Sequence, residues 1–204
     1  TIGNMSAIRL GTRASTLATT QSEMVARLLR SEGLDVDLTT ITTHGDTSTA
    51  SLAAMGGIGV FASAIRATLL KGEADIAVHS FKDLPTGRPL GLAIGAVPAR
   101  ADPRDALVAR DGLTLHDLPQ EASVGTGSPR RAAQLLAVRP DLTIVDIRGN
   151  VDTRLGRVKG LGHYAKGGGK EDLDAVVLAA SGLARLGHSG TVTEFLDPSV
   201  VLPA

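Results

Sequence analysis

The segment 76–85 places His79, Lys82 and Asp83 directly after a short apolar run. We expect a strand that leads into a polar turn, because Pro85 then ends the segment. In open α/β folds, ligands bind at the carboxyl ends of strands. One hypothesis is therefore that Asp83 stabilises positive charge that develops during a reaction. The alternative is that Lys82 and Asp83 form a surface ion pair of little energetic consequence.

A second candidate site lies at residues 124–131, where a strand is expected to enter a glycine turn. Ser128 can cap the following helix, and Pro129 occupies the first helical position, where proline is tolerated. The free backbone N–H groups and the helix dipole then favour an anion, and Arg130 and Arg131 add positive charge. The alternative is a well-capped helix with two solvated arginines, and the pattern alone does not choose between the two.

Two other strand-to-helix turns follow the same logic. Residues 148–154 carry Arg148 and Arg154 around a capping Asn150, and Arg13 lies in a similar turn near the N-terminus. Parallel strands bring such turns to one edge of a sheet. We therefore expect a cleft that binds a polyanion, with carboxylates as its charged groups.

The overall composition excludes several classes of protein. The 204 residues, 43% of them hydrophobic, suffice for one large or two small domains. Lys+Arg and Asp+Glu both total 21, and the chain has few aromatic residues, so nucleic-acid binding is a distant third possibility. Residues 125–160 nevertheless carry seven cations against three acids, and six of those cations are arginine. Arginine favours bidentate capture of carboxylate or phosphate.

The chain contains no cysteine, which excludes a disulfide framework and a thiolate metal site. His44 and His79 have no partner at metal-ligand spacing, so we assign no metal. No apolar run approaches the roughly 18–20 residues of a membrane helix, and no signal-peptide pattern opens the sequence. We expect a cytoplasmic monomer that binds neither nucleic acid nor a membrane.

Strand and helix patterns alternate along the chain, which predicts mainly parallel or mixed sheets flanked by helices. The expected strands are 8–10, 36–43, 75–79, 92–97, 106–109, 123–125, 142–147 and 174–179. The expected helices are 15–33, 58–69, 128–138, 150–161 and 182–186. The apolar face of the first helix is predicted at Leu17, Gln21, Met24, Val25, Leu28 and Leu29.

Two segments are expected to lack regular structure. Residues 98–105 are polar and interrupted by proline, which indicates a crossing between two lobes. Residues 160–169 include five glycines and are expected to form a mobile surface loop.

Taken together, six segments resemble the hydroxymethylbilane synthase, or porphobilinogen deaminase, family. They are 8–15 with Gln21, 78–85, 102–106, 125–131, 148–155 and 181–187. The resemblance covers nearly the whole chain in the right order. It implies an α/β fold of two lobes, like type 2 periplasmic binding proteins, with a cleft between them. The first lobe would comprise residues 1–98 plus 193–204, and the second residues 99–192.

The resemblance also implies a transferase of tetrapyrrole and heme biosynthesis. Such an enzyme condenses four porphobilinogen units head to tail, with loss of ammonia each time, into hydroxymethylbilane on a dipyrromethane cofactor. Asp83 matches the catalytic aspartate, which contacts pyrrole N–H groups and stabilises the cation formed when ammonia leaves. The positions that match cofactor- or substrate-binding residues are Arg13, Ser15, Ser80, Lys82, Thr126, Ser128, Arg130, Arg131, Arg148, Gly149, Arg154 and Arg185.

The sequence departs from the family pattern in two respects. Met55 and Ile58 stand where many members carry lysines. The family also has a third domain whose cysteine holds the cofactor, and the sequence ends before such a domain would begin. We therefore expect this polypeptide alone to form no tetrapyrrole. The alternative function is a non-catalytic receptor for small anions on the same fold, which would keep the arginine turns and have no use for Asp83.

Overall fold

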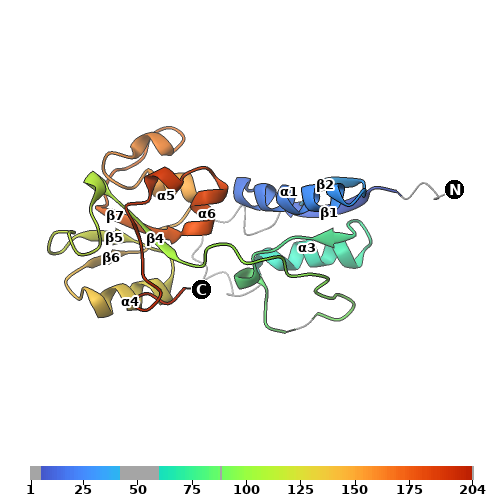
Figure 1. Ribbon diagram of the computed structural model, residues 1–204, viewed down its shortest axis with the longest axis horizontal. Helices are drawn as coiled ribbons and strands as arrows, with labels where there is room; N and C mark the ends of the chain where they lie inside the picture. Colours follow the sequence, from blue (N-terminus) through green and yellow to red (C-terminus); the bar gives the residue numbers. More distant parts are fainter. Residues whose placement is uncertain (1–5, 42–59, 88, 204) are drawn as a thin grey trace. The chain divides into compact units, whose positions relative to one another are not determined.

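The computed structural model describes residues 6–41, 60–87 and 89–203, which form two compact units, Thr1–Pro98 and Ala99–Ala204 (Figure 1). Each unit is built from a β-sheet flanked by helices, so the predicted α/β class is confirmed. The expectations about Met55 and Ile58 lie outside the described residues.

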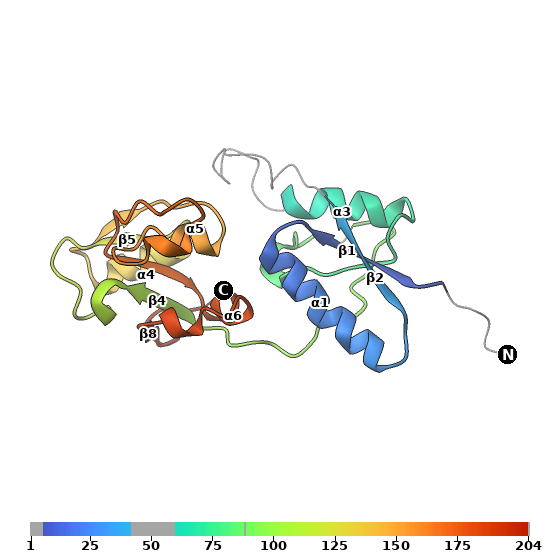
Figure 2. The same ribbon diagram turned by 90° about the horizontal axis from the view of Figure 1, so that it is seen from above.

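The first unit is a three-stranded parallel sheet in the order β2-β1-β3. Its strands are β1 (Ile8–Arg13), β2 (Val36–Ile41) and β3 (Ile76–Ala77). The connections β1-α1-β2 and β2-α3-β3 cross the sheet in opposite directions. Because such crossovers are right-handed, α1 (Thr16–Ser31) and α3 (Val60–Leu70) cover opposite faces of the sheet (Figure 2).

The buried face of α1 matches the predicted one only in part, since Val25 and Leu29 pack against the core cluster of this unit. Ser22 and Ala26 are the buried residues of this helix, whereas Met24 is 44% and Leu28 60% exposed. The Ser22 hydroxyl donates a hydrogen bond of 2.8 Å to Oγ1 of the buried Thr12, so a polar contact holds part of the helix on the sheet. Apolar spacing alone therefore placed Met24 and Leu28 on the wrong side.

The second unit has a five-stranded sheet in the order β6-β5-β7-β4-β8. Its strands are β4 (Asp105–Ala109), β5 (Ser123–Gly125), β6 (Thr143–Val145), β7 (Ala175–Ala179) and β8 (Glu194–Phe195). Strands β5, β6 and β7 are parallel, and β4 is antiparallel to both β7 and β8. The sheet is thus mixed, as the sequence predicts.

Both faces of this sheet are buried, because side chains alternate along its central strands. On β4, Leu107 packs in a core cluster with Leu135, whereas Val108 packs in a second cluster with Leu155 and Leu183. The first cluster belongs to the face covered by α4 (Pro129–Val138). Helices α5 (Val151–Leu155) and α6 (Ala180–Arg185) cover the other face.

Four short 3₁₀ helices complete the described elements. They are η1 (Phe81–Asp83), η2 (Arg110–Gly112), η3 (Gly162–Tyr164) and η4 (Ser189–Thr191).

The segment after residue 192 packs on the second unit, which differs from the expectation that residues 193–204 return to the first lobe. The Thr193 N–H donates to the Leu107 carbonyl at 3.0 Å, and β8 then pairs with β4. Leu196 and Val201 are buried in the same cluster as Leu107. Strand pairing and apolar burial together hold this segment on the second unit.

Two other predictions about local structure are corrected. Residues 92–97 form no strand and are mostly exposed. Helix α5 ends at Leu155, well short of residue 161. In the glycine-rich loop 160–169, Glu171 Oε1 accepts hydrogen bonds from the N–H groups of Gly160 and Gly162 at 2.8 and 3.1 Å, and the mobility of this loop stays a prediction.

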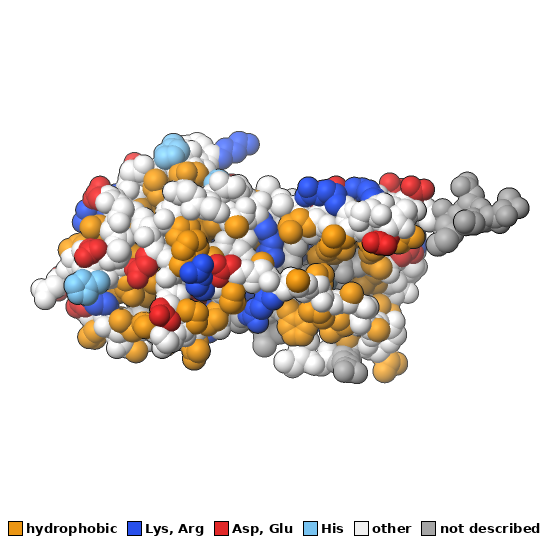
Figure 3. Space-filling model, in the orientation of Figure 1, with side chains coloured by type: hydrophobic (Ala, Val, Ile, Leu, Met, Phe, Trp, Pro, Cys, Tyr) orange, Lys and Arg blue, Asp and Glu red, His pale blue; other side chains and the backbone are white. Residues whose placement is uncertain are grey.

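One face of the described part of the chain is drawn by side-chain type in Figure 3. On the face drawn in Figure 3, basic and acidic side chains are interspersed, in agreement with equal totals of Lys+Arg and Asp+Glu. Within the described ranges, no helix has both the length and the apolar character needed to cross a membrane.

Candidate functional site

In the first unit, four predicted site residues surround one small cavity of about 70 Å³. Arg13 ends β1, Ser15 precedes α1, and Ser80 and Asp83 follow β3. Because β1 and β3 are parallel neighbours, their carboxyl ends meet at the same edge. The cavity is lined by Arg13, Ser15, Leu17, Ala18, Gln21, Val78, His79, Ser80 and Asp83.

Asp83 is held by the turn that carries it. Its N–H donates to the Ser80 carbonyl at 2.9 Å, and the Ser80 hydroxyl donates to Gln21 Oε1 at 3.1 Å. Asp83 is half-buried at the cavity, whereas Lys82 is exposed and does not line it. These two sequence neighbours therefore have different surroundings: Asp83 lines the cavity and Lys82 is exposed to solvent.

His79 lies among the charged groups of this cavity. Burial lowers the pKa of His79 below its ordinary value; Asp83 opposes this shift, and Arg66 and Arg13 reinforce it. The imidazole is therefore mainly neutral at neutral pH and can act as a hydrogen-bond donor or acceptor beside Asp83.

In the second unit, the turns after β5 and β6 lie against each other. A Cβ atom at Gly127 would be 2.6 Å from the Ile147 carbonyl oxygen, so only glycine fits without a shift. The buried Thr126 donates its N–H to the Val145 carbonyl at 3.0 Å, and its hydroxyl accepts from the Ser128 N–H at 3.2 Å. Ser128 caps α4, as predicted, by accepting from the Arg131 N–H.

The turn after β6 is fixed by its own cap. Gly149 has φ +102°, a conformation that favours glycine. Asn150 Oδ1 accepts from the Thr153 N–H at 2.8 Å, as the predicted cap should, and Arg154 Nε donates to the Gly149 carbonyl at 2.8 Å.

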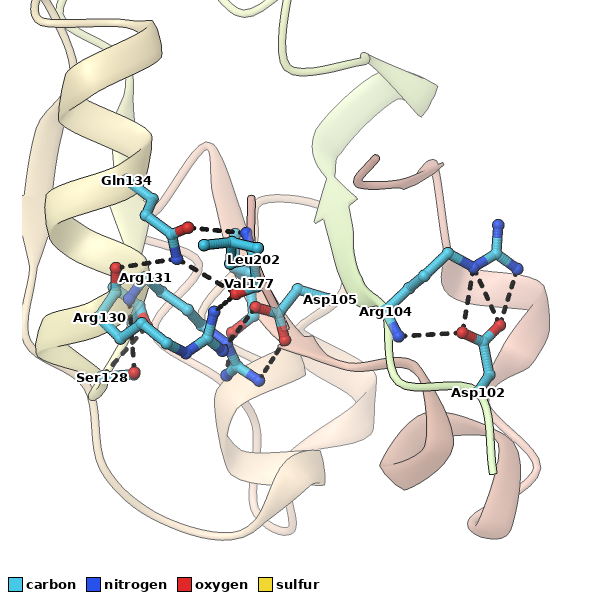
Figure 4. Close-up of polar contacts among 10 residues, drawn as sticks. Asp102, Arg104, Asp105, Ser128, Arg130, Arg131, Gln134, Val177 and Leu202 are labelled. Carbon is cyan, nitrogen blue, oxygen red and sulfur yellow. Dashed lines mark hydrogen bonds and ion pairs between the residues drawn. The ribbon is translucent and has the colours of Figure 1, made fainter. Parts of the chain in front are cut away.

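Arg130 and Arg131 converge on one buried carboxylate, that of Asp105 at the start of β4 (Figure 4). Arg130 Nη2 lies 2.8 Å from Oδ2, and Arg131 Nη2 lies 2.7 Å from Oδ1. Arg131 also donates to the Val177 carbonyl at 3.1 Å, and Arg130 and Gln134 both donate to the Leu202 carbonyl. The alternative of two solvated arginines is therefore wrong for Arg131, which is 8% exposed.

Arg131, Arg148 and Arg154 form a cation cluster. Burial, followed by the charges of Arg131 and Arg148, lowers the pKa of Arg154 below its ordinary value, and Asp146 opposes the shift. Two guanidinium nitrogens of the cluster, Arg131 Nε and Arg148 Nη1, are buried and have no hydrogen-bond partner. A carboxylate could accept hydrogen bonds from these two nitrogens, and its negative charge would offset the positive charge of the three arginines.

The remaining candidate of the second unit is Arg185. Arg185 is the last residue of α6, and no hydrogen bond joins it to the other site residues within the described part of the chain. The contacts of Asp105, Asp146 and Gly127 could not be predicted from the sequence. The motif 102–106 contained Asp105, but nothing in it indicated a pairing with two arginines of α4.

A larger cavity, of about 450 Å³, lies at the opposite edge of the second sheet, near the end of β4. Its two cations, Arg110 and Lys159, both donate to Asp174 Oδ1 at 2.8 Å, and Arg110 also pairs with Asp111. These charges are already compensated by carboxylates, whereas the cation cluster has two buried guanidinium nitrogens without a partner.

The structure is that of an α/β protein with an arginine cluster on one unit and a carboxylate-bearing cavity on the other. The chain belongs to the porphobilinogen deaminase family: the family described as "Porphobilinogen deaminase, dipyromethane cofactor binding domain" matches residues 8–204.

Curated relatives agree with this assignment. A porphobilinogen deaminase from Cutibacterium acnes is 96% identical over 200 residues, which are 98% of this chain and 60% of that protein. One from Micrococcus luteus is 59% identical over 207 residues, which are 98% of this chain and 55% of the relative. The chain thus spans about 60% or less of the length of these two relatives.

Among solved structures, a periplasmic substrate-binding protein of an ABC transporter from Coxiella burnetii resembles the chain with a TM-score of 0.46 and 17% identity. The match covers 94% of this chain and 80% of that one.

Proposed function

We propose that this chain is the cofactor- and substrate-binding part of an enzyme that condenses four porphobilinogen units into hydroxymethylbilane with loss of ammonia. Family membership supports the reaction. The observation that carries the proposal for this chain is the cation cluster, with its two unpartnered buried guanidinium nitrogens. A cytoplasmic location, a monomeric state and the absence of nucleic-acid binding remain predictions.

The second unit supplies the anion contacts in this proposal. Arg148 and Arg154 pair with acetate or propionate groups of the pyrroles, because guanidinium groups bind carboxylates with two parallel hydrogen bonds. Arg131 adds its free Nε, while its Nη atoms remain on Asp105 and Val177. Arg130, Thr126, Ser128 and Gly149 belong to the same edge of the sheet.

A dipyrromethane cofactor fits this donor set, since its pyrroles carry carboxylates, and when bound it supplies the pyrrole to which the first substrate is joined. In the second unit, the residues that would hold it are Thr126, Ser128, Arg130, Arg131, Arg148, Gly149, Arg154 and Arg185. In the first unit, Arg13, Ser15, Ser80 and Lys82 match cofactor- or substrate-binding positions of the family. Since the 204 residues include no cysteine, a thioether to this cofactor would need a residue outside them.

The first unit supplies the reactive carboxylate. An ionised Asp83 can only accept hydrogen bonds, so it suits pyrrole N–H groups and the positive charge that develops on the substrate as ammonia leaves. Its backbone contact to Ser80 and the Ser80–Gln21 hydrogen bond fix the turn at the cavity. His79, neutral beside it, adds a polar group without a competing charge.

Titration calorimetry of the chain with porphobilinogen tests this proposal. Arg148→Met should weaken binding by about tenfold or more, because a charge-assisted hydrogen bond to a carboxylate is lost. Arg157→Met is the matched control, since it also removes one arginine of the second unit, but one that pairs with Asp172. Equal affinities for the two variants would contradict the assignment of the anion site.

A further inference from the structure

His188 contacts a carboxylate that neighbours the cation cluster in sequence. Its Nε2 lies 2.7 Å from Oδ1 of Asp152, the second residue of α5. An ionised carboxylate can only accept, so Nε2 carries the shared proton. The side chain of His188 is 20% exposed and that of Asp152 41% exposed, so the contact is partly shielded from water.

Both the backbone and the ring of His188 are held by neighbouring residues. The His188 N–H donates to the Leu183 carbonyl at 2.8 Å, and the His188 carbonyl accepts from the Thr191 hydroxyl at 2.8 Å. The ring of Tyr164 lies edge-on at 5.1 Å between centroids, and Tyr164 itself packs against the core cluster beneath α5 and α6. His188 therefore offers a preorganised donor rather than a mobile surface side chain.

Asp152 would otherwise oppose the cation cluster. It lies within four residues of both Arg148 and Arg154, whose charges must stay available for a ligand carboxylate. An acid this close competes as an internal ligand if its side chain is free to turn, since each Arg–carboxylate pair formed inside the protein removes one formed with the ligand. The contact with His188 occupies this carboxylate.

We propose that His188 is a positioning residue, which holds the Asp152 carboxylate on α5 so that it does not neutralise Arg148 and Arg154. The inference rests on the proposed anion site and extends it to residues that do not touch the ligand. It assigns no proton transfer to His188.

The test measures the affinity of the chain for two probes, porphobilinogen and inorganic phosphate, together with the melting temperature of each variant. His188→Leu should weaken binding of both probes about five- to tenfold, because the freed carboxylate competes for the arginines. Adding Asp152→Asn to His188→Leu should restore most of that loss. His188→Gln, whose Nε2 can still donate, should stay within about twofold of the unchanged chain.

His116→Leu is the matched control, since His116 and Asp117 form an exposed pair at 3.6 Å on the same unit. It should change neither affinity. If His188→Leu lowers the melting temperature and leaves both affinities unchanged, His188 is merely structural and the inference is overturned. The same holds if Asp152→Asn fails to restore binding.

The two probes separate the inference from the proposed function. A chain that binds phosphate but not porphobilinogen contradicts the proposed function, and His188 is then judged on phosphate alone. A chain that binds neither probe has no anion site, which overturns both.

Discussion

Arg131 Nη2 donates to Asp105 Oδ1 at 2.7 Å, with side chains only 9% and 2% exposed. Removing one member of a buried ion pair leaves the other charge uncompensated. We expect Asp105→Asn to lower the free energy of unfolding by about 3 kcal/mol, measured by urea denaturation. Asp102→Asn is the control, because the Asp102–Arg104 pair is 36–40% exposed, and it should cost less than about 1 kcal/mol. Similar small losses in both variants would contradict a structural role for Asp105.

Gly127 is expected to tolerate no side chain. A methyl group there would meet the Ile147 carbonyl oxygen at 2.6 Å, so the turns after β5 and β6 would have to separate. Gly127→Ala should lower the free energy of unfolding by about 1–3 kcal/mol and weaken porphobilinogen binding. Gly190→Ala, where a Cβ atom meets open space, should do neither. Unchanged stability and affinity in Gly127→Ala would contradict this prediction, because the turns after β5 and β6 could then move apart at little cost in free energy.

Asp174 should make the second unit sensitive to acid. Burial pushes the pKa of Asp174 up, but hydrogen bonds from Lys159, Ser123 and Arg110 outweigh it, so the pKa lies well below its ordinary value. A lowered pKa adds stability above the unfolded-state value of about 4 and loses it as pH falls towards the folded-state value. Urea unfolding at pH 5 and pH 3 should therefore show a larger loss for the unchanged chain than for Asp174→Asn. Equal losses would contradict this.

Asp83→Asn separates an enzyme from a receptor. In a protein that joins this chain to the remaining length of its relatives, turnover of porphobilinogen should fall by about 10²-fold or more, because the negative charge that stabilises the developing cation is lost. Bound pyrrole, followed by intact mass, should persist, since the arginines are untouched. Lys71→Met is the control, because it removes an exposed charge of the same unit that does not line the cavity, and it should leave turnover unchanged. Unchanged turnover in Asp83→Asn would favour the receptor.

Local signals in the sequence predicted much of this structure. Strand β5 and the capped helix α4 follow from a glycine turn, Ser128 and Pro129, all within a few residues of one another. The same kind of signal predicted the Asn150 cap, and parallel pairing predicted that the ends of β5 and β6 share an edge. The arginine-rich edge could therefore be predicted before the structure was known.

Contacts between distant residues could not be predicted in this way. Asp105 and Arg131 are 26 residues apart, and no local pattern indicates that the carboxylate occupies two guanidinium groups. Met24 and Leu28 keep helical spacing, yet both are exposed. The buried side of helix α1 instead carries Ser22, whose hydroxyl donates to Thr12. The segment after residue 192 was misplaced because strand pairing with β4 is invisible in its own sequence.

The arginine cluster sits in a chain of zero formal net charge, and this determines how a ligand arrives. At physiological ionic strength the field of an exposed charge is largely screened beyond about 8 Å, so a dianion is not drawn in from a distance. Encounters therefore proceed at the rate of ordinary diffusion, without long-range steering. At the proposed anion site, selection among anions would then depend on residence time: a ligand that accepts hydrogen bonds from Arg131 Nε and Arg148 Nη1 would dissociate more slowly than one that does not.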